Sequence, residues 1–378
     1  MRNSKPKYKK IAVTGGPCAG KTTFLNLAKE KLLGWGIEGA FPQESATIII
    51  NSGLSPKKLL ERNDDSHSQM QELIAHTLLH FEDFIAPKIL AIKKSEKGVI
   101  ICDRGLPDVK AYMKNPKDFP KLLKKLHIPT MQAWERYDAG IFLVTAADGK
   151  PEFYSKENNP ARYENVKEAL ENDQKIRAAW NGHPHLIIVD NSTLFNAKMK
   201  KALRGLQRVL GIPVSLEIER KFLLPAMPDL SGLPNMQKTE IEQVYLKSKG
   251  KPGEERVRKR SRDGGSTFYR TFKTASAVKS VREEREEQIT EREYQRLVRC
   301  EANPDHDAIR KDRFTFIHNN QYFELDLFKY PKRLADLALL EIELTDVNDK
   351  VNLPAWLGEA KEVTSDKRYS NYNLSQKP

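Results

Sequence analysis

The stretch KIAVTGGPCAGKTT, residues 10–23, joins a short apolar run, a glycine-rich loop and the start of a helical segment. Residues 15–22 fit the pattern G-x-x-x-x-G-K-T, between a strand and a helix as a phosphate-binding loop requires. Glycines let the backbone wrap around phosphates, while the loop N–H groups and the helix N-terminus attract the anion. We therefore expect ATP and Mg²⁺ to bind here, through Gly15, Gly20, Lys21, Thr22 and Thr23.

Further buried strands follow this loop, at residues 98–103, 139–146 and 185–191, and helix-forming segments separate them. This alternation predicts a doubly wound parallel sheet, and hence an α/β domain over residues 1–212. Asp103 ends one strand at the carboxyl edge, where open sheets bind ligands. It could hold Mg²⁺ through a water, act as general base toward an acceptor hydroxyl, or only cap the following turn.

The segment NPARYENVKEALENDQKIRAAW, before the last of these strands, has the composition of a helical lid. Its Arg162 and Arg177 could stabilise charge on a transferred phosphoryl group, although single arginines on helices are commonly solvated. Glu44 follows a second predicted strand and could contact an acceptor. Gln71 and Glu72 are weaker candidates of the same kind.

The first part of the chain resembles the kinase-like P-loop NTPases, which include nucleoside and ribosylnicotinamide kinases. GGPCAGKTT, CDRG and the arginine-bearing lid carry the resemblance, which covers residues 10–211. It implies binding of ATP and phosphoryl transfer, but it specifies no acceptor.

Beyond residue 212 the chain consists of short, alternating segments separated by Gly, Pro, Asn or Asp, which favours an antiparallel sheet or barrel. In LEIERKFLL, residues 216–224, strand geometry places Glu217, Glu219 and Lys221 on one face and Phe222 on the other. Similar charge pairs recur in ERVRKR, FYRTFK, VREEREE, RKDRFTF, FELDLF and EIEL. Solvent-exposed strand faces would explain one such pair, but acids and bases separated strand by strand favour charges that point into a barrel.

EIERK is the E-x-E-x-K signature of the CYTH, or triphosphate tunnel metalloenzyme, superfamily, which residues 214–374 resemble. RVRKR, FELDLF, LLEIEL and DKRYSNYNL follow in the order found in that family. The resemblance implies an eight-stranded antiparallel tunnel over residues 213–378 that binds a triphosphate with Mg²⁺ or Mn²⁺. The metal ligands would be Glu217, Glu219, Glu341 and Glu343, followed by Glu284, Glu286 and Asp326. The phosphate clamp would be Lys221, Arg256, Arg258, Lys273, Lys311 and Arg313, with Lys367 and Arg368 less certain.

The segment VREEREEQI departs from this pattern, because its crowded charges allow two registers. Either Glu284 and Glu286 face the tunnel, or Glu283, Arg285 and Glu287 do. Among the implied tunnel residues, Glu217, Glu219 and Lys221 would act directly in catalysis, as Asp103 would in the first domain.

The composition limits the cellular location and the partners that the protein can be expected to have. The net charge of +13 lies mostly in the first 213 of the 378 residues, and three widely spaced cysteines indicate a reducing compartment. With no signal peptide and no apolar run of about 20 residues, a cytoplasmic protein without a membrane segment is expected. RNA is a less favoured partner than a small polyphosphate or nucleotide, because no aromatic-interleaved motif is present.

These patterns predict a two-domain phosphate-processing enzyme, a metal-dependent triphosphatase joined to a kinase-like ATP-binding domain. Two alternatives remain open from sequence: an adenylyl cyclase of the tunnel family, and a regulatory protein that binds nucleotide or RNA in a tunnel without catalysis. The oligomeric state is not encoded in these patterns.

Overall fold

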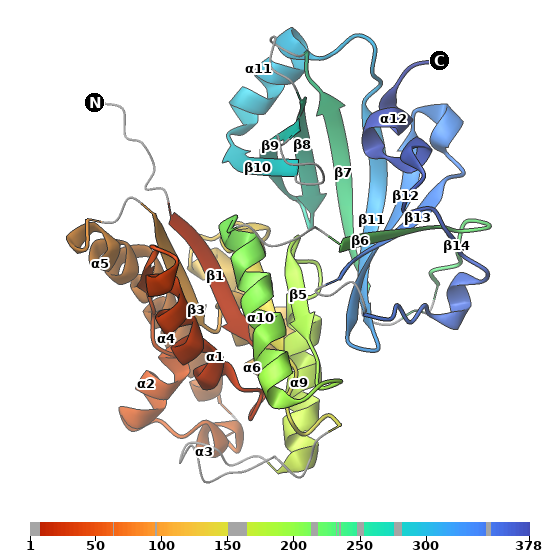
Figure 1. The fold of residues 1–378 in the computed structure, drawn as a ribbon. Helices are drawn as coiled ribbons and strands as arrows, with labels where there is room; N and C mark the ends of the chain where they lie inside the picture. The colour runs from red at the N-terminus through yellow and green to blue at the C-terminus, as the bar shows by residue number, and fades with distance from the viewer. Residues whose placement is uncertain are drawn as a thin grey trace. The chain divides into compact units, whose positions relative to one another are not determined.

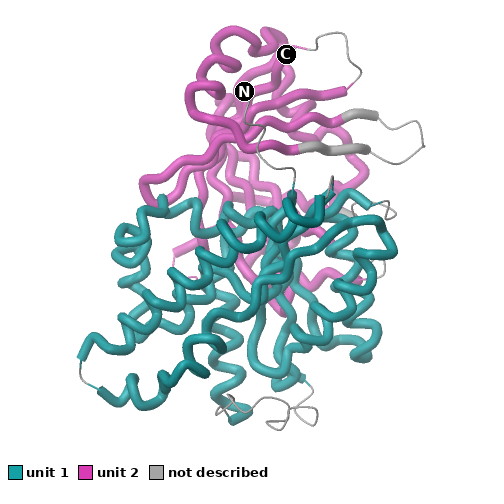
Figure 2. Tube along the Cα trace, turned by 90° about the vertical axis from the view of Figure 1, so that its left-hand side faces the viewer, with its two compact units in different colours: residues 1–214 teal, residues 215–378 magenta. Residues whose placement is uncertain are grey.

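The structure is a computed structural model that describes residues 8–62, 64–94, 97–149, 165–212, 218–231, 233, 236–247, 253–275, 282–344 and 349–378. For residues 218, 274–275 and 282–285 it describes the backbone alone. The chain divides into two compact units, unit 1 at Met1–Val214 and unit 2 at Ser215–Pro378 (Figure 2). The sequence placed this boundary near Ile212. In the described part of the chain, no helix is long and apolar enough to cross a membrane.

Unit 1 is built on a five-stranded parallel sheet with the order β2-β3-β1-β4-β5 (Figure 1). The parallel sheet predicted from the sequence is therefore confirmed. In this order Val13 at the end of β1 lies beside Asp103 at the end of β3, so the phosphate loop and Asp103 leave the same edge. The strands are β1 (Tyr8–Thr14), β2 (Glu38–Ala40), β3 (Gly98–Asp103), β4 (Ala139–Leu143) and β5 (Leu186–Val189).

Helices cover both faces of this sheet. Apolar residues of α1 and α10 pack with β1, β3 and β4 in one core, and α4, α6 and α7 contribute to a second. A π-helical turn, η1 (Phe81–Ile85), separates α4 from α5. The helices are α1 (Lys21–Gly34), α2 (Ser45–Asn51), α3 (Pro56–Leu60), α4 (Ser66–His80), α5 (Ala86–Ile92), α6 (Leu106–Tyr112), α7 (Phe119–Lys125), α8 (Gln132–Glu135), α9 (Val166–Trp180) and α10 (Phe195–Leu210).

Unit 2 is a large antiparallel sheet with the order β10-β9-β8-β7-β11-β12-β13-β6-β14. The described residues form nine strands rather than the eight expected, because the two-residue strand β14 pairs with the outer edge of β6. Helices α11 (Glu291–Glu301) and α12 (Asn371–Ser375) complete the unit. The strands are β6 (Ile218–Leu223), β7 (Gln237–Tyr245), β8 (Glu254–Arg262), β9 (Gly265–Ala275), β10 (Arg282–Ile289), β11 (Ile309–His318), β12 (Gln321–Tyr330), β13 (Ala338–Leu344) and β14 (Lys361–Glu362).

The two faces of this sheet differ in character. On one face, Phe222 of β6 and Val257 of β8 enter apolar cores, and the Val257 core includes Leu297 of α11. The other face, which we call the interior face, carries the alternate residues. Residues that lie directly opposite each other on neighbouring strands point to the same face, so the strand pairing identifies the interior face. Arg260 lies opposite Ile241, Ile241 lies opposite Lys311, and Glu324 lies opposite Glu341. The predicted alternation of Lys221 and Phe222 on β6 is confirmed.

Candidate functional site

The phosphate loop of unit 1 joins β1 to α1. Gly15 has a φ of +135°, and a Cβ there would lie 2.0 Å from the carbonyl oxygen of Leu143, so only glycine fits. Gly20 has a φ of +92° at the N-cap of α1. The Lys21 ammonium donates to the carbonyl oxygens of Gly15 and Gly16, at 3.0 and 2.9 Å. Burial, together with repulsion from Arg104, lowers the pKa of Lys21 to about 8. Thr22 and Thr23 are exposed at the start of α1.

The loop is held in place by α9. The Asp173 carboxylate accepts hydrogen bonds from the backbone N–H of Gly16 at 2.9 Å and of Thr145 at 3.0 Å. Arg177 pairs with Asp173 at 2.7 Å, and its guanidinium lies 5.5 Å from the ring centre of Phe142. The side chain of Arg177 is thus bound beneath the loop and does not line the cavity described next, in contrast to its predicted place on a lid. Arg162 lies outside the described residues.

A cavity of about 800 Å³ opens beside the loop and stays within unit 1. The loop, α2, α3, α4, α6 and α9 contribute residues to its lining. Cys18, Gly20, Lys21, Thr22 and Thr23 line it together with Glu44, Gln71, Asp103 and Arg104. The sequence prediction therefore selected residues that share one cavity. Glu72 is not among the lining residues and pairs with Lys125 at 2.7 Å.

Asp103 differs in its environment from the other carboxylates of this cavity. Its Oδ1 atom is buried and has no hydrogen-bond partner in the structure. Burial, followed by repulsion from Glu44, raises the pKa of Asp103 to about 6. Glu44, by contrast, is paired with Arg104 and accepts a hydrogen bond from the Thr47 hydroxyl at 2.5 Å. Burial alone would raise the pKa of Glu44, but Arg104 and Lys21 lower it to about 2. The Glu44 carboxylate is therefore anionic, and it is already occupied by Arg104 and Thr47.

Arg104 is oriented by its backbone. Its φ of +72° is unusual for a residue with a side chain, and the guanidinium bonds to Asp108 at 3.1 Å in addition to Glu44. Asp108 is itself saturated, by Thr14 at 2.6 Å and by the Trp180 indole N–H at 2.8 Å. The side chains around Asp103 are thus fixed by other partners, and its own oxygen is left for a ligand.

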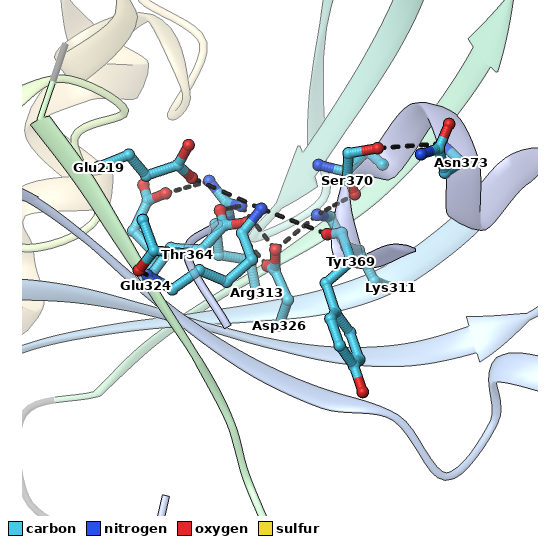
Figure 3. A network of polar contacts seen from close by, with 12 residues as sticks. Glu219, Lys311, Arg313, Glu324, Asp326, Thr364, Tyr369, Ser370 and Asn373 are labelled. Atoms are coloured by element: carbon cyan, nitrogen blue, oxygen red, sulfur yellow. Dashed lines mark hydrogen bonds and ion pairs between the residues drawn. The ribbon is translucent and has the colours of Figure 1, made fainter. Parts of the chain in front are cut away.

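In unit 2 a dense cluster of charges lies on the interior face (Figure 3). The Arg313 guanidinium donates to Asp326 at 2.7 and 2.6 Å, to Glu341 at 3.0 Å, and to Glu324. Lys311 donates to Asp326 at 2.5 Å, and Lys221 pairs with Glu341 at 2.9 Å. Strands β6, β11, β12 and β13 therefore bring their charged residues together, as the inward-facing interpretation requires.

Burial and pairing set the pKa of each of these groups. Burial opposes ionisation of Asp326, but Arg313 and Lys311 lower its pKa below the usual value. Burial also opposes ionisation of Glu341, but Lys221 and Arg313 lower the pKa of that carboxyl. Burial outweighs Arg313 at Glu324 and raises its pKa. At Glu219, burial and then repulsion from Glu341 raise the pKa to about 7. Since the Glu219 side chain is 52% exposed, its shift reflects chiefly the neighbouring carboxylate.

A basic row on β8 occupies another part of the interior face. Register places Arg256, Arg258, Arg260 and Arg262 on the same face as Lys311, and Lys273 follows on β9. Burial, followed by repulsion from Arg256, lowers the pKa of Arg258 to about 10. Lys273 on β9 also acts on the pKa of Glu219 on β6, although the two strands are far apart in the sheet order. The sheet therefore curves, and its basic and acidic parts face a common space.

The register of β10 agrees with one of the two alternatives. Glu286 lies opposite Thr271 and accepts a hydrogen bond from its hydroxyl at 2.9 Å, and Thr271 is fully buried. Glu284 lies opposite Lys273, although its side chain is outside the described part. Glu284 and Glu286 therefore belong to the interior face, and Glu283, Arg285 and Glu287 to the other.

Two predicted residues are not brought to this cluster. The Arg368 side chain is 83% exposed and pairs with Asp366 at 2.6 Å, because it lies on a short turn and not on a strand. Lys367 is also exposed. Glu343 is exposed as well, but it lies opposite Glu219 on the interior face. Glu217 lies outside the described residues. The prediction omitted Arg260 and Arg262, which continue the same two-residue spacing along β8, and His67, which lines the unit 1 cavity.

Divalent metals are implied for both units, and the two sets of donors fit them differently. In unit 1 the exposed Thr22 hydroxyl and the unpartnered Asp103 oxygen fit a Mg²⁺ ion that accompanies a nucleotide. In unit 2, Arg313 occupies the position between Glu324, Asp326 and Glu341, so those carboxylates are already neutralised. Across the described residues of the chain, no group of three or more His, Cys, Asp or Glu could hold a metal ion. Among the described residues of unit 2, Glu219 lies opposite Glu343 and is repelled by Glu341, so a cation would relieve the repulsion at Glu219.

Comparison with known proteins assigns the first unit to a family. A family model described as "AAA domain" matches residues 10–198, half of the chain. The chain belongs to this family. The matched region contains the phosphate loop and Asp103, so family and geometry together indicate a nucleotide- or phosphate-processing protein.

Solved structures also show similarity. The inorganic triphosphatase NE1496 is 28% identical, over 44% of this chain and 97% of its own, with a TM-score of 0.32. The PH1012 protein from Pyrococcus horikoshii OT3 is 22% identical, over 35% of this chain and 80% of its own, with a TM-score of 0.25. A search of curated proteins finds no match.

Proposed function

We propose that the protein is a two-domain phosphate-processing enzyme, in which unit 1 binds ATP and transfers its γ-phosphoryl group to a small acceptor. One observation carries this proposal: an unpartnered, buried carboxylate oxygen of Asp103 lines the same cavity as Lys21 of the phosphate loop. A carboxylate with a pKa of about 6 can accept a hydroxyl proton near neutral pH.

Each residue of the unit 1 site has its own role in this reaction. The loop N–H groups hold the β- and γ-phosphates, and the Lys21 ammonium turns from the carbonyl oxygens of Gly15 and Gly16 to the phosphate oxygens. Thr22 would hold the Mg²⁺ ion, which supplies neutralising charge when bound. Asp103 takes the proton from the acceptor hydroxyl. Holding Mg²⁺ through a water is the other role open to Asp103.

We propose that unit 2 binds and hydrolyses a triphosphate that arrives with Mg²⁺ or Mn²⁺. The arginine row of β8, with Lys273, Lys311 and Arg313, supplies cations for a chain of phosphates. Glu219 and Glu343, which lie opposite each other on β6 and β13, are described carboxylates that could bind the accompanying ion, and Glu217 precedes Glu219 in the signature. Arg313 must release at least one carboxylate if more of them are to bind the ion.

Phosphate release from inorganic triphosphate and ADP formation from ATP, each with Mg²⁺ or Mn²⁺, test the two halves. The variants are Lys21→Ala and the double variant Glu217→Ala/Glu219→Ala in the full chain. Hydrolysis of triphosphate should survive Lys21→Ala and disappear in the double variant, while ATP turnover follows the opposite pattern. If only Lys21 matters for both substrates, unit 2 is not a triphosphatase. Formation of cyclic AMP from ATP would instead identify a cyclase.

A further inference from the structure

The cavity of unit 1 also extends along α4. One face of this helix lines it, through residues at helical spacing, namely His67, Met70, Gln71, Ile74 and Leu78. From residue 67 to residue 78 this face covers about 16 Å, at about 1.5 Å per residue. A site of this length has room for an acceptor molecule that carries a polar group at a distance from its reacting hydroxyl.

His67 is a buried polar residue of this face with an unpaired ring nitrogen. The residue is 3% exposed, and its Nδ1 atom is buried and has no hydrogen-bond partner in the structure. An unpaired buried polar atom is costly, so a ligand that bonds to Nδ1 would remove that cost. Burial and the nearby Lys114 lower the pKa of His67, so the ring is neutral near pH 7. In the tautomer that is protonated at Nδ1, the ring donates a hydrogen bond from that atom.

Two lysines line the cavity in addition to Lys21 of the phosphate loop. Lys114 directly follows the C-cap of α6, and among the described residues it is the charged group that acts on the pKa of His67. Lys175 lines the cavity from α9. Neither Lys114 nor Lys175 is in an ion pair within the described part of the chain, so both ammonium groups are available to an anion.

The carboxylates that line the cavity belong to the phosphate-loop end. Each of them acts on the pKa of Lys21, and they are Glu44, Asp103 and Asp108. By contrast, no carboxylate of the described residues acts on the pKa of His67. Lys114 also acts on Asp64, but Asp64 is not a lining residue and accepts a hydrogen bond from the backbone N–H of Ser66 at 2.9 Å. The surroundings of His67 therefore favour an anion.

We propose that His67 and Lys114 form an anion site in this cavity, and that the acceptor of unit 1 is an alcohol with a phosphate or carboxylate group away from its reacting hydroxyl. This inference rests on the phosphoryl-transfer function proposed for unit 1 and adds the charge of the acceptor to it. The acceptor hydroxyl lies at Asp103. The anionic group accepts a hydrogen bond from Nδ1 of His67 and pairs with Lys114. A nucleoside has no anionic group and would leave both residues unpaired.

The transfer balances with the groups present. The acceptor hydroxyl oxygen forms a bond to the γ-phosphorus of ATP, and the bond from that phosphorus to the β–γ bridging oxygen breaks. The electron pair leaves with ADP, and the hydroxyl proton passes to the Asp103 carboxylate and then to solvent. The anionic group and His67 take no part in these bond changes, since they only hold the acceptor in place.

A binding experiment on the full chain tests the anion site directly. The eight histidines are labelled with ¹³C in the ring, and the His67 resonance is identified by its absence in His67→Gln. Mg²⁺ and a non-hydrolysable ATP analogue occupy the phosphate loop, and the probes are inorganic phosphate and acetate. The variants are Lys114→Ala and, as a matched control, Lys117→Ala. Lys117 is exposed and close in sequence, but it does not line the cavity.

We expect inorganic phosphate or acetate to shift the His67 resonance until the site is saturated. Lys114→Ala should weaken this binding about 10-fold, the low end of the effect of losing a charged hydrogen bond, because Lys114 is exposed. Lys117→Ala should change it less than about twofold. A stronger response to phosphate assigns a phosphate group to the acceptor, and a stronger response to acetate assigns a carboxylate. No shift with either anion, or equal weakening in the two lysine variants, would overturn the proposal.

Transfer from radiolabelled ATP separates this inference from the proposed function. The acceptors are two matched pairs, ribose with ribose 5-phosphate and glycerol with glycerate. The anionic member of at least one pair should have the higher kcat/KM, and Lys114→Ala should raise its KM about 10-fold with the KM for ATP unchanged. If anions bind at His67 but no acceptor receives phosphate, the anion site stands and the transfer function fails. If the neutral members are preferred, the inference is overturned and the transfer function stands.

Discussion

At the residue scale, Asp103 differs from the neighbouring carboxylates because theirs accept hydrogen bonds and its Oδ1 atom has no hydrogen-bond partner. Asp108 receives hydrogen bonds from Thr14, Arg104 and Trp180, and Glu44 is bound by Arg104 and Thr47. Those hydrogen bonds and ion pairs explain Asp108 and Glu44 as parts of the folded structure. An Asp103 oxygen left without a partner inside a cavity has a functional reason instead.

Replacing Asp103 with Asn should separate its two candidate roles. Asn keeps an oxygen for a metal-bound water but cannot accept a proton, so loss of a general base should lower kcat by about 10²- to 10⁴-fold. Binding of ATP, measured by calorimetry, should be nearly unchanged. If instead kcat is largely restored at high Mg²⁺, Asp103 acts on the metal and not on the acceptor.

The Glu44–Arg104 pair should make stability depend on pH in a defined window. The folded-state pKa of Glu44 is lowered from 4.5 to about 2, so its contribution is fully present above pH 4.5 and is lost as pH falls toward 2. The contribution at neutral pH is about 3–4 kcal/mol, because the pKa falls from 4.5 to about 2 and each pKa unit corresponds to about 1.4 kcal/mol.

Urea unfolding of wild type and Glu44→Gln at a series of pH values measures this contribution. The difference in unfolding free energy should be constant from pH 5 to 8 and should shrink below pH 4.5. A difference that does not change with pH would show that the variant loses packing and not charge.

At the scale of single elements, the strands of unit 2 show what local sequence can predict. Alternation along β8, β11, β12 and β13 correctly selected inward-facing Arg258, Lys311, Arg313, Asp326 and Glu341, because a strand turns successive side chains to opposite faces. It could not predict that Arg313 would bind three carboxylates from β12 and β13, since those contacts depend on register between strands.

The same reasoning explains why Arg368 and Arg177 do not lie where the sequence patterns placed them. Arg368 lies on a turn, where the period of two does not apply, and its nearest acid is Asp366 on the same turn. Arg177 lies on a helix, and only the tertiary position of Asp173 decides that it binds beneath the phosphate loop. The loop itself was predictable because its glycines are required locally, whereas the cavity beside His67 is formed by helices distant in sequence.

The basic row of β8 offers a test with a control on the same strand. Arg258 points to the interior face, whereas Lys259, its neighbour, points to the other. Arg258→Ala should weaken binding of inorganic triphosphate about 10- to 150-fold, the usual effect of losing a charged hydrogen bond. Lys259→Ala removes the same charge and should change affinity less than about twofold, as measured by calorimetry. Equal losses in both variants would indicate a general charge effect, with no specific site on the interior face.

At the scale of the whole molecule, each unit has its own apolar cores. In unit 1 one core joins the sheet to α1 and α10, and a second lies among α4, α6 and α7. The cores of unit 2 join strands β6 to β13 to α11 and the C-terminal segment. The change in sequence texture near residue 212 reflects this division, because parallel strands buried on both faces are continuously apolar and antiparallel strands alternate. The number of strands was harder to predict from the sequence, because the two residues of β14 are too few to show an alternating pattern.

Separate cores predict separate unfolding transitions in the full chain. Differential scanning calorimetry should resolve two, because each unit holds a complete apolar core of its own. ATP with Mg²⁺ at about 100 times its Kd should stabilise one transition by about 2.7 kcal/mol, which for a unit of this size raises Tm by about 5–10 °C. Inorganic triphosphate should raise the other transition. Lys21→Ala should abolish the shift by ATP and leave the shift by triphosphate, whereas a single transition that both ligands raise would mean that the two units unfold as one.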